Sequence, residues 1–144
     1  MSALAQARSP REFRFKVIAL PLTAGKIAYQ GGMACVDSGN NDVRPGEASN
    51  TGLVRVGNFA ETLDNSAGSS TAQVLVELDK EVVCQWYDND TGSNALTSGE
   101  LFESAYILDD HTVSKSSGSS TRSVAGRVWA VDSVNGVAVE TTNL

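Results

Sequence analysis

Histidine and cysteine are scarce in this 144-residue chain, which has one histidine, His111, and two cysteines. A serine hydrolase needs a base to take the hydroxyl proton, so His111 is the only histidine that could serve. The chain also lacks a Gly-x-Ser-x-Gly elbow, a Gly-x-Gly-x-x-Gly loop and a Walker loop. Those motifs mark many hydrolases and nucleotide-binding proteins. We therefore expect no enzyme, no catalytic residue and no cofactor.

The two cysteines, Cys35 and Cys84, lie 49 positions apart, without the spacing of a metal site. Each is in a predicted strand among apolar neighbours. Free thiols in such positions pack as small hydrophobic side chains. We expect two buried free thiols rather than a disulfide.

Long apolar runs are absent too, and nothing approaches the roughly 20 residues that span a bilayer. The first residues, MSALAQARSPREFRF, lack a charged start followed by an apolar stretch, so they do not resemble a secretory signal. The sequence indicates one domain that folds and assembles in a cytoplasm.

The net charge of −6 is unevenly distributed. Residues 1–30 carry a local charge of +4, and the remainder carries −10. A basic segment on an acidic body could bind nucleic acid, but the sign of the body would repel phosphates. An acidic protein surface, on its own oligomer or on a partner, is the better candidate.

Short strands dominate the periodic pattern. In QVLVELD, Val74, Val76 and Leu78 alternate with polar residues, as in a strand with one wet face. The following EVVCQWYD could pair with this strand or extend it through a bulge near Lys80. The other predicted strands cover residues 13–20, 26–30, 33–37, 53–59, 103–108, 125–132 and 136–141. The sequence predicts an all-β protein, either a compact antiparallel β-sandwich of jelly-roll type or a small β-barrel with an extended N-terminal arm.

Turn signals separate these strands. The pair Asn135–Gly136 predicts a tight antiparallel hairpin between the last two strands. Thr97 and Glu100 have capping-box spacing, which predicts one helical turn before a strand. We expect a basic extended arm over residues 1–25 and a β-domain over residues 26–144.

The segment ILDDHTVSK, residues 107–115, is the one place that suggests chemistry. In an extended segment Asp109 and His111 would point to one side, giving two metal ligands where zinc or calcium needs four or more. Further ligands would have to come from Asp88 and Asp90, in a segment that departs from a calcium-binding loop. Adjacent aspartates after an apolar strand also favour a turn. We predict an acidic turn between two strands, and no metal site.

Several segments together resemble a known family. They are KIAYQGGMACVDSGNNDVRPG, VRVGNFAETLDNSAG and AYILDDHTVSKSSGSSTRSVAGRVWAVDSVNGVAVE. Their order, from about Lys26 to Glu140, is similar to that of bacteriophage and prophage capsid cement, or head decoration, proteins. The resemblance implies a compact β-structural virion protein that attaches to the outside of the shell formed by the major capsid protein. It implies a homo-oligomer, a dimer or trimer, that opposes the pressure of packaged DNA at capsomer junctions.

The same resemblance implies no catalytic residue, no membrane and no direct contact with nucleic acid, with assembly in the cytoplasm of a bacterial host. The N-terminal residues match the family less clearly, so their role is argued from charge. We expect the arm to contact a neighbouring subunit through basic and aromatic side chains. These are Arg8, Arg11, Phe13, Arg14, Phe15 and Lys16.

Two other functions suit a β-rich chain. A tail or fibre-base component of a virion would have the same composition. A glycan-binding β-sandwich could use Trp86, Tyr87 and Trp129 as a stacking platform, although tryptophans in strands usually pack in a core or a subunit contact.

Overall fold

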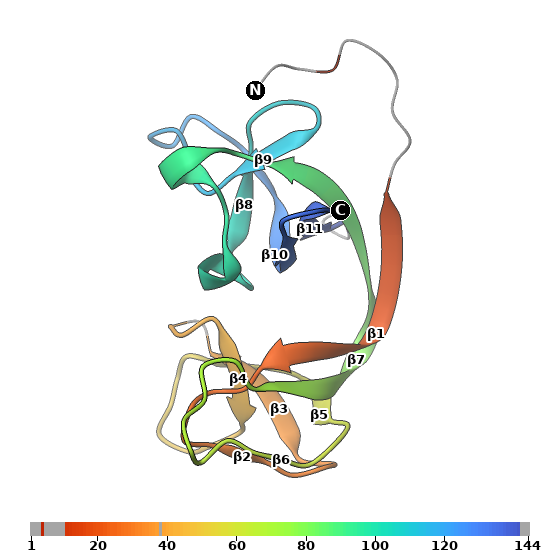
Figure 1. Cartoon of the computed structure of the whole chain (residues 1–144), viewed down its shortest axis with the longest axis vertical. Helices are drawn as coiled ribbons and strands as arrows, with labels where there is room; N and C mark the ends of the chain where they lie inside the picture. Colours follow the sequence, from red (N-terminus) through yellow and green to blue (C-terminus); the bar gives the residue numbers. More distant parts are fainter. Residues whose placement is uncertain (1–3, 5–10, 38, 142–144) are drawn as a thin grey trace. The chain divides into compact units, whose positions relative to one another are not determined.

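The computed structural model describes residue 4 and residues 11–37 and 39–141, and these form an all-β protein (Figure 1). The predicted fold class is confirmed. The strands are β1 (Glu12–Pro21), β2 (Ile27–Ala28), β3 (Met33–Asp37), β4 (Asp42–Pro45), β5 (Leu53–Phe59), β6 (Leu63–Asp64), β7 (Gln73–Asn89), β8 (Ser104–Ile107), β9 (Thr112–Ser114), β10 (Val124–Asp132) and β11 (Gly136–Glu140). Two 3-10 helices, η1 (Gly92–Asn94) and η2 (Ser98–Glu100), separate β7 from β8.

Most predicted strands are present, and the alternation in β7 buries Val74, Val76 and Leu78 as expected. The two segments whose relation was open form one strand, β7, of 17 residues. The capping box at Thr97 is present, and so is the hairpin between β10 and β11. The strand predicted over residues 26–30 is shorter than expected, because only β2 pairs there, with β6.

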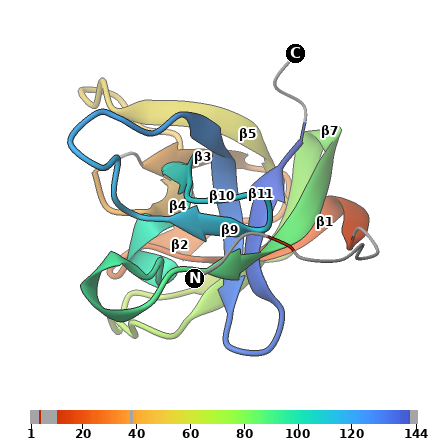
Figure 2. The same cartoon turned by 90° about the horizontal axis from the view of Figure 1, so that it is seen from above.

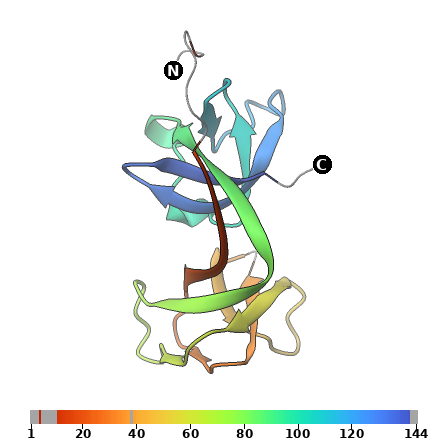
Figure 3. The ribbon, with the colours of Figure 1, turned by 90° about the vertical axis from the view of Figure 1, so that its right-hand side faces the viewer.

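Contacts divide the chain into two units. Unit 1 comprises residues 1–14 and 82–144, and unit 2 comprises residues 15–81. β1 and β7 pair with each other, and each contributes residues to both units (Figure 3). The segment predicted as a basic arm, residues 1–25, thus contains β1, while residues 1–3 and 5–10 lie outside the described residues.

Unit 1 closes its strands into a ring. Residues 82–89 of β7 pair with β11, β11 with β10, β10 with β8, and β8 with β9. β9 then returns to β7 as a parallel neighbour, with Asp88 opposite Thr112. Figure 2 shows β10 and β11 of this ring as a long hairpin. Unit 1 is therefore a small five-stranded barrel, one of the two architectures predicted.

Unit 2 closes in a related way. Residues 73–81 of β7 pair with β5, β5 with β3, and β3 with β4, while β1 pairs with β7. Just after β1, Leu22 forms a parallel bridge with Val43 of β4, and the Thr23 amide donates to the Val43 carbonyl at 2.9 Å. These contacts complete a second ring.

Both units follow one pairing order. In each unit, the first strand contacts the third in parallel and pairs with the fifth. The second strand pairs with the third and with the fourth, and the fourth strand pairs with the fifth. The strands of unit 2 in this order are β1, β3, β4, β5 and residues 73–81 of β7. Those of unit 1 are residues 82–89 of β7, β8, β9, β10 and β11. β7 is the last strand of one unit and the first of the other.

The backbone hydrogen bonds repeat as well. In each unit, a residue with positive φ precedes the second strand, and its backbone amide donates to the carbonyl of a buried residue in the fourth strand. The amide of that buried residue in turn donates to the carbonyl of the residue after the positive-φ residue. The bonds are Gly31 N to Phe59 O (2.9 Å), Phe59 N to Gly32 O (2.9 Å), Phe102 N to Val128 O (2.8 Å) and Val128 N to Glu103 O (2.9 Å). The fourth strands share a bulge before a buried glycine, Gly57 or Gly126, which lies opposite Ala34 or Ala105. The two units are therefore structural repeats.

Both thiols are buried and free, as the sequence predicts. Burial, together with the nearby Glu140 carboxylate, raises the pKa of Cys84 to about 12. Burial also raises the pKa of Cys35, against the opposing effect of Arg55. Because the thiolate is the reactive form, we expect native protein to resist iodoacetamide at pH 8 and denatured protein to be alkylated twice, as counted by mass spectrometry. Rapid alkylation of native Cys84 would contradict this prediction.

Candidate functional site

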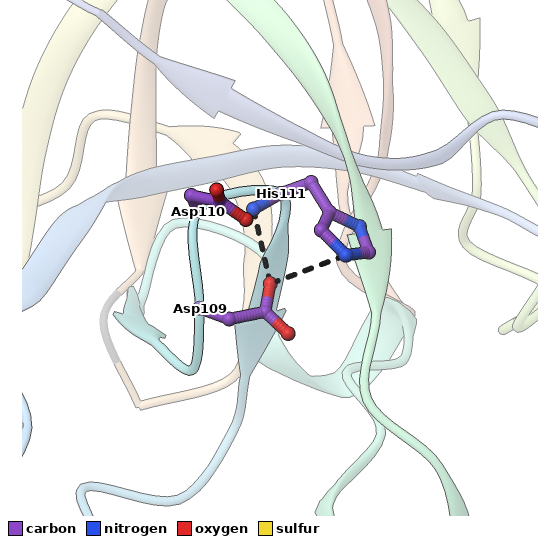
Figure 4. A group of neighbouring side chains, drawn as sticks. All are labelled: Asp109, Asp110 and His111. Carbon is purple, nitrogen blue, oxygen red and sulfur yellow. Dashed lines mark hydrogen bonds and ion pairs between the residues drawn. The ribbon is translucent and has the colours of Figure 1, made fainter. Parts of the chain in front are cut away.

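The acidic turn predicted within residues 107–115 lies between β8 and β9 in unit 1. Asp109, Asp110 and His111 each offer a ligand atom within 4.8 Å of the others (Figure 4). The turn forms because the Asp109 carboxylate accepts the His111 amide at 3.0 Å. Such a bond from an aspartate to the amide two residues later is the usual mechanism of an Asx turn.

The His111 ring lies between two carboxylates. Its Nδ1–H donates to Asp88 Oδ2 at 2.7 Å, and its Nε2 is 3.6 Å from Asp109 Oδ1. The side chain is 13% exposed. The partner Asp88 comes from β7, so the imidazole supports the short parallel contact that closes the barrel. His111 therefore has a structural role between β7 and β9.

Two hydroxyls follow His111 in the chain, and Thr112 Oγ1 lies 3.3 Å from His111 Nδ1. Ser114, which is fully buried, donates from Oγ to Asp90 Oδ2 at 2.8 Å. Asp88 and Asp90, considered as additional metal ligands, thus contact His111 and Ser114 respectively. The structure brings Asp88 to the acidic turn. Asp90 lies beyond the turn and contacts β9 instead. These contacts favour a role in joining the strands of unit 1 over a nucleophilic or metal-binding role.

Asp109 has a perturbed pKa. Its partial burial favours the neutral form, but hydrogen bonds from the His111 amide and from Thr112, together with the charge of His111, lower the pKa overall. A carboxyl whose pKa falls on folding stabilises the folded state above its unfolded pKa, and this contribution is lost as the pH falls. Asp109 therefore supports the turn at neutral pH.

We expect Asp109→Asn to lower the free energy of unfolding by about 1 kcal/mol at pH 7, because a charged acceptor becomes neutral. The stability of the variant should also depend less on pH below about 4, the unfolded pKa of aspartate. Urea unfolding at pH 7 and at pH 3 measures both effects. The adjacent exposed Asp110→Asn is the matched control, and an equal pH dependence in the two variants would contradict the prediction.

Two described residues near the start of the chain, Leu4 and Arg11, contact this acidic end of unit 1. The Leu4 amide donates to Asp110 Oδ1 at 2.9 Å, and Arg11 is 3.6 Å from Asp88 Oδ1. Arg11 also accepts the Trp86 amide through its carbonyl at 3.0 Å. Among the described residues of the basic start of the chain, Arg11 therefore pairs with a carboxylate of unit 1.

The other predicted contact residues are distributed along β1. The Phe13 ring stacks on Trp86, with centroids 5.3 Å apart. Arg14 pairs with Glu12 at 3.2 Å, Phe15 is partly buried, and Lys16 is exposed. Arg8 lies outside the described residues. The described members of this set therefore follow one another along the chain, from Arg11 to Lys16 at the start of β1.

The two tryptophans considered for glycan stacking both pack within the protein. Trp86 stacks on Phe13, and Trp129 is only 4% exposed. The Trp129 Nε1–H donates to Glu140 Oε1 at 3.0 Å, and its ring meets Phe102 edge to face at 5.7 Å. Buried tryptophan usually has such a partner for its N–H. These contacts support the packing interpretation.

The fold is a tandem pair of β-units, with an acidic turn that accepts a hydrogen bond from the Leu4 amide. No family model, curated protein or solved structure matches the chain. No helix among the described residues is long and apolar enough to cross a membrane.

Proposed function

We propose that this chain is a structural virion protein, a capsid cement or decoration protein of a bacteriophage head. It would bind the outer surface of the major capsid protein shell at capsomer junctions, as a homo-oligomer, and stabilise the DNA-filled head. The ordered set of motifs between Lys26 and Glu140 supports this proposal by resemblance. The all-β fold is compatible with it.

The observation that carries the proposal is the repeat of one pairing order in two units. A shell presents the same subunit surface many times, so a chain with two similar units suits two similar sites. When one unit is bound, the other is held at a high effective concentration near its own site. A modest affinity per unit is then enough for stable attachment.

The mechanism follows from this bivalency. Outward pressure separates neighbouring capsomers at their junctions, and a protein bound on both sides adds its binding energy to the cost of separation. Each contact can be weak, because it is repeated over the whole shell. This function needs a rigid scaffold and no catalytic group.

Binding to heads tests the proposal directly. Heads assembled from the major capsid protein, but lacking this chain, should bind it in hundreds of copies per head, as measured by co-sedimentation and quantitative mass spectrometry. A tail or fibre-base component would instead be found in a few copies per particle. Failure to bind such heads at micromolar concentration would contradict the proposal.

The contribution of the N-terminal residues needs its own variant. Removing residues 1–16 would delete half of β1, which pairs with β7, so loss of binding could reflect loss of structure. Removing residues 1–10 keeps β1 intact and deletes Arg8. If the arm contacts the capsid, occupancy should fall while the circular dichroism spectrum stays unchanged. Unchanged occupancy would exclude residues 1–10 from the contact and leave the basic and aromatic residues from Arg11 to Lys16, or the barrel units, to carry it.

A further inference from the structure

The barrel of unit 1 closes at a short parallel contact between β7 and β9, which we call the seam. Two residue pairs face each other across the seam, whereas β10 and β11 pair at four positions. Backbone hydrogen bonds cross the seam from Asp88 N to His111 O at 2.8 Å and from Asp90 N to Val113 O at 2.9 Å. Because the seam is short, side-chain contacts across it contribute a larger share of its stability.

Side chains also cross the seam. Ser114 Oγ donates to Asp90 Oδ2 at 2.8 Å, and the His111 ring contacts Asp88 Oδ2 through Nδ1 at 2.7 Å. A serine hydroxyl stays neutral in water, but an imidazole changes its charge near neutral pH. His111 is also the single histidine of the chain. The seam therefore includes a contact whose charge depends on pH.

The two charge states of the ring bind differently. A neutral ring with its proton on Nδ1 donates to Asp88 and presents the lone pair of Nε2 toward Asp109 Oδ1, 3.6 Å away (Figure 4). A protonated ring has an N–H on each nitrogen, so it interacts favourably with both carboxylates. Hydrogen bonds to ionised groups are roughly twice as strong as those between neutral groups. The protonated form of His111 is therefore held more tightly than the neutral form.

The charged groups around the ring also favour its protonated form. They are Asp88 on β7, Asp109 and Asp110 in the turn, and Arg11 before β1. Arg11 opposes a positive ring, but it lies against the other oxygen of Asp88, at 3.6 Å. Burial opposes the charge as well, because the His111 side chain is 13% exposed. Three carboxylates, two of them in contact with the ring nitrogens, outweigh one guanidinium and this burial.

We propose that His111 is a pH-sensitive latch on the seam between β7 and β9. The protonated ring closes the seam by pairing with Asp88 and Asp109, and loss of the proton loosens it. This stabilisation is present below pH 6.5 or so, where histidine titrates in an unfolded chain, and is lost as the pH rises through the midpoint of the folded protein. An open seam exposes the edges of two strands, which are able to pair with other chains. The inference does not depend on the proposed virion function.

Amide hydrogen exchange in the ¹⁵N-labelled full chain measures the seam directly, because the Asp88 and Asp90 amides donate across it. After correction for the intrinsic exchange rate at each pH, we expect the seam to open about tenfold more at pH 8.5 than at pH 5.5. The amides of Phe102 and Val128, which join β10 to the segment before β8, should change much less. Equal seam opening at the two pH values, or an equal change at Phe102 and Val128, would overturn the proposal.

Titration of the His111 ring signals gives an independent measurement. A tenfold change in opening requires the ring to titrate about one pH unit higher in the closed seam than in the open one. We therefore expect a midpoint near pH 7.5 in the native protein, against about 6.5 in urea. A native midpoint below 6.5 would mean that the neutral ring is preferred, and would overturn the proposal.

Two variants separate the charge of the ring from its packing. His111→Gln keeps a side-chain N–H donor but cannot be charged, so its seam should open equally at pH 5.5 and pH 8.5. If this variant loses its dispersed spectrum, Asp109→Asn replaces it and should lower the His111 midpoint, while Asp110→Asn, the matched control, should lower it less. Persistent pH dependence in a folded His111→Gln protein, or an unchanged midpoint in Asp109→Asn, would overturn the proposal.

Discussion

Gly136→Ala should lower the free energy of unfolding of unit 1 by about 4 kcal/mol, among the largest effects of a single substitution. A Cβ at this position would lie 2.1 Å from the Tyr87 carbonyl oxygen, and the residue has a φ of 98°. The contact is with backbone of β7, paired with β11, so no side chain can move aside. Both the clash and the backbone conformation oppose the substitution.

Urea unfolding followed by tryptophan fluorescence measures this effect, because Trp86 and Trp129 both belong to unit 1. Gly92→Ala is the matched control. Gly92 has a φ of 63°, but a Cβ atom added there would meet nothing within 4 Å. The control should cost about 1 kcal/mol, the strain of the left-handed conformation alone. Equal losses of unfolding free energy in the two variants would show that the close contact with the Tyr87 carbonyl does not cause the destabilisation.

Alternation allowed the strands to be predicted, because it depends only on which face of a strand is wet. β7 shows this in its first half, where alternate apolar residues are buried. The same alternation does not say which strands pair with each other. The parallel contact of β7 with β9 brings Asp88 to His111, 23 positions away, and no local pattern encodes it. The acidic turn was therefore predicted, whereas Asp88 was named only as one of two possible additional metal ligands, with Asp90.

The repeat was not predicted, although it leaves a signal. Val-x-Val-Glu occurs at residues 74–77 and again at 137–140. The signal is weak because spacing varies: Val74 and Val137 are 63 positions apart, but Ala34 and Ala105 are 71 positions apart. Insertions in the loops shift each strand differently. A shared strand, β7, further hides the boundary that two separate copies would show.

Phe59→Ala should destabilise unit 2 by about 4 kcal/mol. Phe59 is 2% exposed, and truncation of a buried phenylalanine removes its transfer free energy and leaves a cavity. Each unit closes its own ring of strands, so unit 2 can open without breaking the hydrogen bonds among β8, β9, β10 and β11. The loss should therefore be confined mainly to unit 2.

Native-state hydrogen exchange resolves the two units. A loss of about 4 kcal/mol corresponds to roughly a thousandfold faster exchange through opening of unit 2. We expect this acceleration at Ala34 and Val76, in β3 and β7, and much less at Ala105 and Val139, in β8 and β11. Val128→Ala, at the equivalent position of unit 1, should reverse the pattern. Equal acceleration in both units would mean that β7 couples them into a single cooperative fold, and that the repeats do not open separately.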